Sequence, residues 1–141
     1  MLRRELTPQR KKAIKRVLMK RRLAATGPPA EVVEAVYERA SHSCEICDVM
    51  VRDRRGIDHH LHHRRPRGAG GTRREDSNEP QNLMLLCPGC HSTVESHRNE
   101  AYAMGWLVGQ ALDPAHVSVL VCGRWVLLTP DGGYRDAGET S

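Results

Sequence analysis

The sequence predicts a small α+β domain that is held together by a structural zinc ion. Two Cys-x-x-Cys pairs, Cys44/Cys47 and Cys87/Cys90, have the spacing of zinc knuckles. Stretches with helical periodicity alternate with short apolar runs that are typical of strands. The chain has 141 residues, of which 4% are aromatic and none is Phe. A core with so few large side chains needs a staple, and a bound metal supplies one.

Positive charge is concentrated at the N-terminus of the chain. The formal net charge is +5, but residues 1–26 carry ten basic side chains and one acid, so the remaining residues sum to −4. No stretch approaches the ~18–20 apolar residues of a membrane span. The basic N-terminus is not followed by the apolar region of a secretory signal. We therefore expect a cytoplasmic protein without a membrane partner.

Residues 1–29 are predicted to form a basic helical arm. Thr7-Pro8 is a helix start signal, Gly27-Pro28-Pro29 is a stop signal, and a helix over roughly residues 8–25 fits between them. Its apolar stripe is narrow, and the rest of its surface is cationic. The predicted role is electrostatic binding of a nucleic acid backbone. Basic side chains that neutralise phosphates release the counterions that were condensed on the nucleic acid, and this release favours binding. A solvated tail and a membrane-surface helix are the alternatives. The cations assigned to binding are Lys11, Lys12, Lys15 and Arg16.

The rest of the chain is predicted to form one domain and a C-terminal addition. A helix is expected from residue 30 to about 41, and a buried strand at 83–86. A further helix follows Cys90 to about Met104 and ends at Gly105. Residues 117–121 and 125–128 are expected to pair as a hairpin. The predicted parts are a domain over 30–108, a hairpin segment over 109–130 that packs on it, and a flexible tail over 131–141.

The two cysteine pairs are separated by 39 residues, from Asp48 to Leu86. This is longer than the separation in a zinc ribbon, so a structure of some size must lie between the knuckles. Unrelated free thiols are one alternative. A redox pair is another, although neither pair opens a thioredoxin-like unit. We expect Cys44, Cys47, Cys87 and Cys90 to bind one structural Zn²⁺, which couples folding to metal binding.

Histidines are dense between and after the knuckles, at positions 59, 60, 62, 63, 91 and 97. Residues 62–71 read HHRRPRGAGG, and residues 82–91 read NLMLLCPGCH. Together with the flanking knuckles, these motifs resemble the HNH endonuclease family, most closely its small phage and prophage members with a supporting zinc. The resemblance covers roughly residues 31–108. It implies that the domain 30–108 contains a ββα-metal core, and that helices lie N-terminal to this core.

The resemblance also implies roles for individual residues. His63 is expected to be the general base that activates water against a phosphodiester bond. Asn82 is expected to hold the loop that carries His63. His62 stands where the family usually has Asp, and with His91 it is expected to bind a catalytic divalent cation. Glu95 is the expected third ligand, because it lies four residues after His91 and residues i and i+4 share a helix face. His97 is the alternative.

Several points stay open from the sequence. Asp58-His59 also mimics the family dipeptide, which would move the base to His59, although the Pro66 and Gly-Gly offsets favour His63. The histidines are also compatible with a second structural zinc. The catalytic cation is Mg²⁺, Mn²⁺, Ni²⁺ or Zn²⁺, and the loss of a carboxylate disfavours Mg²⁺. The expected DNA contacts in the Arg-rich loop are Arg64, Arg65, Arg67, Arg73 and Arg74.

The predicted function is therefore metal-dependent hydrolysis of DNA. The resemblance suggests a part in phage DNA packaging beside the large terminase subunit, in a bacterial or phage-infected host cell. The alternative is a non-catalytic zinc-containing module that binds nucleic acid. A plasmid cleavage assay with different metals separates the two.

Overall fold

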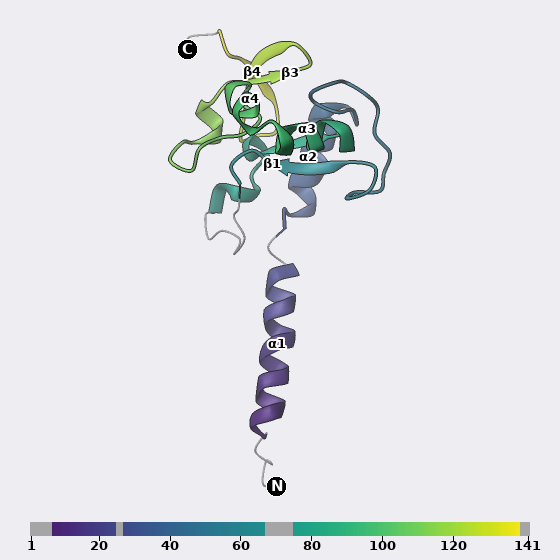
Figure 1. Ribbon diagram of the computed structural model, residues 1–141, viewed down its shortest axis with the longest axis vertical. Helices are drawn as coiled ribbons and strands as arrows, with labels where there is room; N and C mark the ends of the chain where they lie inside the picture. Colours follow the sequence, from purple (N-terminus) through teal and green to yellow (C-terminus); the bar gives the residue numbers. More distant parts are fainter. Residues whose placement is uncertain (1–6, 25–26, 67–74, 139–141) are drawn as a thin grey trace.

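The chain begins with two helices in the computed structural model, which describes residues 7–24, 27–66 and 75–138. Helix α1 spans Pro8–Ala24 and helix α2 spans Ala30–Ala40. Both lie close to the predicted ranges. In Figure 1, α1 extends away from the remaining elements, which are grouped around a small sheet. A left-handed Ser41 ends α2, and the chain then leads directly into the first knuckle.

The next elements form a ββα unit. Strand β1 (His60–His63) pairs antiparallel with strand β2 (Leu83–Leu86), and His62 lies opposite Met84. Helix α3 (Pro88–Ser96) packs against both strands. Its start is capped by Cys87, whose Sγ accepts a hydrogen bond from the backbone N–H of Cys90 at 3.4 Å. The second knuckle and the first turn of α3 are therefore one piece of structure.

A second helix, α4 (Arg98–Ala103), follows α3 after a break at His97. The sequence predicted one continuous helix to about Met104, which was wrong at this point. His97 has φ −123° and ψ 61°, which are not helical. Ala101 of α4 is buried. Gly105 ends α4 as predicted, with φ +75°.

The C-terminal part forms a second, three-stranded sheet of β3 (Val119–Val121), β4 (Arg124–Leu128) and β5 (Tyr134–Asp136), all antiparallel. The first two strands are the predicted hairpin. The third lies in the tail that was expected to be flexible, and this expectation was wrong for residues 134–136. Three short 3₁₀ helices, η1 (Glu75–Asn78), η2 (Pro80–Asn82) and η3 (Pro114–His116), complete the fold.

Strand β2 is buried on both faces and lies at the centre of the core. Met84 and Leu86 point into a cluster with residues of α3, β3 and β4, which also includes Cys44. Leu83 and Leu85 point the other way, towards Val36 of α2. This alternation explains why the sequence shows a continuous apolar run, as is typical of a strand covered on both sides. The structure is thus the predicted α+β fold.

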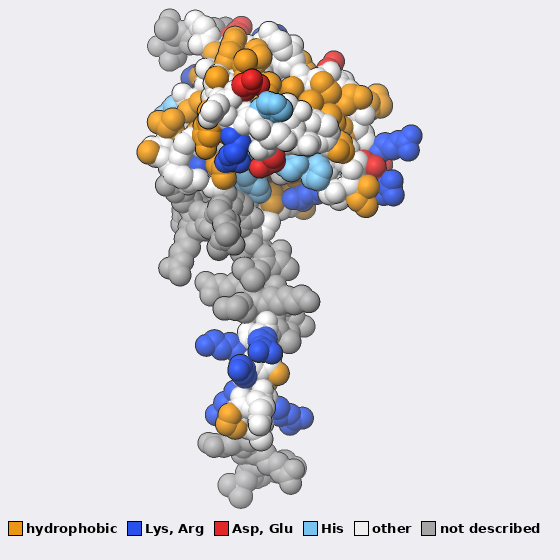
Figure 2. Space-filling model, viewed as in Figure 1, with side chains coloured by type: hydrophobic (Ala, Val, Ile, Leu, Met, Phe, Trp, Pro, Cys, Tyr) orange, Lys and Arg blue, Asp and Glu red, His pale blue; other side chains and the backbone are white. Residues whose placement is uncertain are grey.

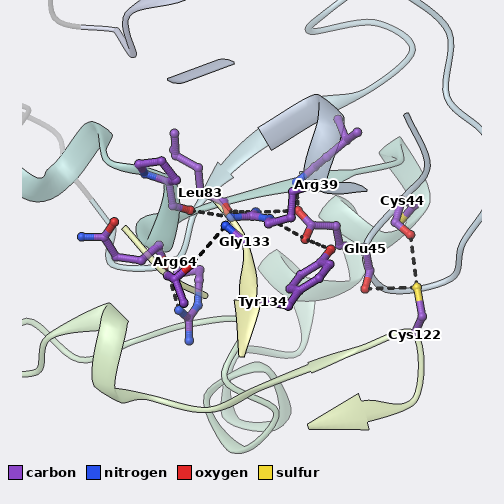
Figure 3. Close-up of polar contacts among 12 residues, drawn as sticks. Arg39, Cys44, Glu45, Arg64, Leu83, Cys122, Gly133 and Tyr134 are labelled. Atoms are coloured by element: carbon purple, nitrogen blue, oxygen red, sulfur yellow. Dashed lines mark hydrogen bonds and ion pairs between the residues drawn. The ribbon is translucent and has the colours of Figure 1, made fainter. Parts of the chain in front are cut away.

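A buried ion pair joins the first knuckle to α2, β2 and β5 (Figure 3). Nη2 of Arg39 lies 2.8 Å from Oε1 of Glu45, and both side chains are almost fully buried. Arg39 also donates to the carbonyl of Leu83 at 2.6 Å, and the N–H of Leu85 donates to Glu45 at 2.9 Å. The hydroxyl of Tyr134 donates to the other Glu45 oxygen at 2.6 Å. These bonds explain why β5 is held against the domain.

Candidate metal centres and active site

The four knuckle cysteines come together in space. Their Sγ atoms all lie within 4.8 Å of one another, and those of Cys47 and Cys87 are 3.7 Å apart. A tetrahedral zinc with Zn–S bonds of about 2.3 Å has sulfur atoms about 3.8 Å apart, so the group fits Zn²⁺. Burial, and next the hydrogen bond with Cys87, raise the pKa of the Cys90 thiol. A bound cation offsets the free-energy cost of deprotonating this buried thiol, because the cation stabilises the thiolate.

A second group of donors is formed by His62 of β1 with His91 and Glu95 of α3. Their ligand atoms all lie within 4.8 Å of one another. A metal bonded at about 2.1 Å holds its donors roughly 3–4 Å apart, so a small contraction is enough to bind one. His97, the alternative third ligand, is not in this group. It is exposed at the junction of α3 and α4. Two imidazoles and one carboxylate on one side of a cation form a donor set that leaves coordination positions open.

The orientation of His62 is fixed by a backbone carbonyl. The residue is 4% exposed, and Nε2 of its ring lies 2.7 Å from the carbonyl oxygen of Trp106. Since a carbonyl only accepts, Nε2 carries the proton, and the lone pair of Nδ1 is left for a cation. Burial lowers the pKa of His62 to about 4, against the effect of this hydrogen bond. No sequence pattern indicates the Trp106 carbonyl, because a backbone group has no signature of its own.

The side chain of His63 points to the opposite face of β1 from that of His62, and His63 does not join the donor group. Its Nε2 lies 2.9 Å from Oδ1 of Asn78, a residue of η1. Because this oxygen accepts, the proton is on Nε2 and Nδ1 is the basic nitrogen. Asn78 was missed by sequence reasoning. A residue in a polar turn, far from its partner along the chain, offers no periodicity to reveal it.

Asn82 is fully buried and connects two segments around His63. Its Oδ1 accepts from the N–H of Arg65 at 2.8 Å, and its Nδ2 donates to the carbonyl of Ser77 at 2.8 Å. Its own carbonyl accepts from the N–H of Arg64, also at 2.8 Å. These bonds tie the chain that leaves β1 to the chain that enters β2. The role of Asn82 in holding the loop that carries His63 stays a prediction, and these bonds are the contacts through which it would act.

Arg64 and Arg65 are buried, so the expectation that they contact DNA was wrong. The guanidinium of Arg64 is completely covered and donates to four backbone carbonyls at 2.8–2.9 Å, those of Gln81, Gly105, Pro114 and Val117. Burial lowers the pKa of Arg64 to about 10. Arg65 binds the carbonyl of Leu112 and the carboxylate of Asp76. Both cations join the ββα unit to the segment after α4 rather than facing a ligand.

The other expected DNA contacts divide into two sets. Lys11, Lys12, Lys15 and Arg16 are exposed on α1, and Figure 2 shows basic side chains along that helix. Arg67, Arg73 and Arg74 lie outside the described residues.

His59, the alternative base, is engaged through both ring nitrogens. Nε2 accepts from the hydroxyl of Tyr37 at 2.7 Å, and Nδ1 donates to the carbonyl of Arg52 at 2.6 Å. His59 as a whole is 2% exposed. Asp58 pairs with Arg54 at 3.0 Å instead of turning towards the donor group. The contacts of His59 are those of a structural residue, and they favour His63.

Comparisons with known proteins agree with this geometry. Residues 44–97 match the family model described as HNH endonuclease. This range contains both knuckles, both strands of the ββα unit and α3. Searches of curated proteins and of solved structures returned no significant match. Within the described ranges, no helix is both long and apolar enough to cross a membrane. The chain therefore contains a domain of the HNH endonuclease family, a family of nucleases.

Proposed function

We propose that the protein is a metal-dependent endonuclease that hydrolyses phosphodiester bonds of DNA. The observation that carries the proposal is the donor group of His62, His91 and Glu95 within the ββα unit of an HNH domain. A module that only binds nucleic acid needs no such group beside its structural zinc. The group of four knuckle cysteines supplies the frame, because its second knuckle begins the helix on which His91 and Glu95 stand.

The cation held by this group is proposed to be Mn²⁺, Ni²⁺ or Zn²⁺ in preference to Mg²⁺. Imidazole nitrogens suit transition metals, whereas Mg²⁺ favours carboxylate, phosphate and water oxygens. His62, His91 and Glu95 would hold the cation, and when bound it would polarise the phosphate and stabilise the departing oxygen. Because Nε2 of His62 donates its proton to the carbonyl of Trp106, Nδ1 is the nitrogen of His62 that is left to bind the cation.

His63 is proposed to act as the general base. Nδ1 takes a proton from water as the water oxygen attacks phosphorus. The bond from phosphorus to the 3′ oxygen breaks, and that oxygen then takes a proton from solvent. The hydrogen bond between Nε2 and Asn78 keeps the ring in the tautomer that this step needs. Asn82 positions His63 indirectly, because it fixes the backbone of the two residues that follow it.

DNA binding is proposed to depend on the exposed cations of α1. Contacts with phosphates hold the polymer near the site without reading its sequence. We therefore expect weak sequence preference. The part in phage packaging beside the large terminase subunit stays a prediction that rests on the family resemblance. The cytoplasmic location stays a prediction from the composition of the sequence.

The test is cleavage of supercoiled plasmid by the zinc-loaded protein with added Mn²⁺, Ni²⁺ or Mg²⁺, and with a chelator as control. We expect nicked or linear DNA with the transition metals. His63→Ala and His91→Ala should abolish cleavage while DNA binding persists. His116→Ala replaces an exposed histidine of η3 and should cleave normally. Binding without cleavage in the wild-type protein under every metal would favour the non-catalytic zinc module instead.

A further inference from the structure

The two histidines of the candidate metal group are oriented in different ways. The ring of His62 is fixed by its hydrogen bond to Trp106. No hydrogen bond to the ring of His91 is formed by the residues that the structure describes. Rotation of an imidazole about χ2 meets only broad, shallow minima. Among the described residues, the His91 ring is contacted by other imidazoles rather than by hydrogen-bond partners.

His60 provides a contact that restricts this rotation. Its ring stacks on that of His91, with the centroids 4.4 Å apart and the planes inclined by 21°. His62 meets the same ring edge-on, at 5.8 Å and 64°. His60 and His62 are two residues apart in β1, so both point to the face that α3 covers. The ring of His91 thus has one imidazole against its face and another at its edge.

We propose that His60 is a positioning residue, which orients the metal ligand His91 by ring stacking and does not bind the metal itself. His60 is outside the donor group that the described residues form. Sequence reasoning assigned it no part in the reaction, because the Pro66 and Gly-Gly offsets favour His63 as the base and leave His60 as a strand residue. The inference rests on the metal site of the proposed function, but it does not require that DNA be cleaved.

The experiment compares Ni²⁺ affinity, measured by calorimetry on zinc-loaded protein, across a series of His60 variants. His60→Phe keeps an aromatic ring and removes both nitrogens, whereas His60→Gln keeps polar atoms and removes the ring. We expect His60→Phe to bind Ni²⁺ like the wild-type protein. His60→Gln and His60→Ala should bind about two- to tenfold more weakly, the value of one aromatic pair. His116→Ala is the control for loss of an exposed histidine, and His91→Ala defines loss of the site.

Each outcome decides the proposal. Unchanged Ni²⁺ affinity in His60→Ala overturns it. Weak Ni²⁺ binding by His60→Phe together with normal binding by His60→Gln also overturns it, because a polar atom of the side chain, and not ring stacking, would then be responsible. Absence of Ni²⁺ binding in the wild-type protein also overturns it. In a nicking assay, His60→Ala should need more metal for half-maximal rate and reach the same maximal rate. If Ni²⁺ binds as expected but no DNA is cut, the proposed function fails and the role of His60 stands.

Discussion

Nε2 of His62 lies 2.7 Å from the backbone carbonyl of Trp106, so a residue of β1 depends on a segment 44 positions further along the chain. That segment is anchored in turn, because Nε1 of Trp106 donates to the carbonyl of Leu120 in β3 at 2.8 Å. The C-terminal sheet therefore takes part in placing the candidate metal group. The sheet acts through the backbone segment between α4 and η3, which carries the Trp106 carbonyl.

Gly105, in this segment, has little freedom to change. It has φ +75°, and a Cβ there would lie 2.1 Å from the carbonyl oxygen of Ser118. Gly123 has a similar φ of +82° but nothing within 4 Å of a Cβ. Gly123→Ala should cost about 1 kcal/mol for the left-handed backbone alone. Gly105→Ala should cost roughly 3 kcal/mol or more, because the backbone must also shift away from the clash.

Urea unfolding of the zinc-loaded variants measures this difference. We also expect Gly105→Ala to weaken Ni²⁺ binding, since the Trp106 carbonyl moves with its neighbour. Equal losses of stability in the two variants would show that the close approach to Ser118 is unimportant.

Removal of one knuckle thiolate should unfold the domain. Cys87 is a member of the four-cysteine group and also caps α3, so Cys87→Ser removes a zinc ligand and weakens the helix start. Apparent zinc affinities in finger peptides are on the order of 10–16 kcal/mol, more than a small domain has in reserve. Cys122→Ser is the matched control, because this exposed thiol is outside the group. Zinc content and circular dichroism provide the readout, and a folded, active, zinc-free Cys87→Ser protein would contradict the structural assignment.

The sequence predicted those parts of the fold that depend on local patterns. The apolar run at 83–86, the start and stop signals around α1, the helical periodicity of α2 and the cysteine spacing each reflect a short-range rule. The donor group was also predicted, because His91 and Glu95 are one helical turn apart and the family resemblance supplied His62. Arg64 and Arg65 were misassigned for a physical reason. Arginines beside glycines and prolines suggest an exposed loop, and only the tertiary structure shows carbonyls converging on their guanidinium groups.

Strand β5 was missed because it is held by pairing with β4 and by a hydrogen bond to a distant residue, rather than by a pattern in its own sequence. Tyr134 lies among glycines and charged residues, which are typical of a loose tail. Its hydroxyl nevertheless reaches Glu45, which is buried beside Arg39. Asn78 and the Trp106 carbonyl were missed in the same way, since each acts through a partner that is distant along the chain.

Tyr134 should make stability fall at alkaline pH. Burial, and next the charge of Glu45, raise its pKa above the usual value near 10. Above about pH 10 the unfolded chain loses this proton while the folded chain keeps it, so the free energy of unfolding decreases as pH rises. Tyr134→Phe should cost about 1.5–3 kcal/mol at neutral pH, because it removes a hydrogen bond to a carboxylate.

The same variant should flatten the alkaline decline. Part of the decline should remain, because burial also raises the pKa of Tyr37. Tyr102 is about as exposed as Tyr134, at 44% against 41%, but only the hydroxyl of Tyr134 is bonded to Glu45, so Tyr102→Phe should leave the stability at neutral pH unchanged. The measurement is the urea midpoint between about pH 7 and pH 11, a range that spans the ordinary tyrosine pKa. An unaltered slope in Tyr134→Phe would mean that its hydroxyl ionises in the folded protein as it does in water.

The cations of α1 should govern how DNA affinity depends on salt. Lys11 and Lys15 are exposed on a helix that extends away from the domain (Figure 1), so replacing them with Gln should leave the unfolding midpoint unchanged. If each contacts a phosphate, the slope of log affinity against log salt should become less steep by about 2. Arg124 and Arg135 lie in the C-terminal sheet, and their replacement by Gln changes the net charge by the same amount. Fluorescence anisotropy with a labelled duplex between about 50 and 200 mM salt distinguishes a specific arm from a general charge effect, since only the α1 pair should change the slope.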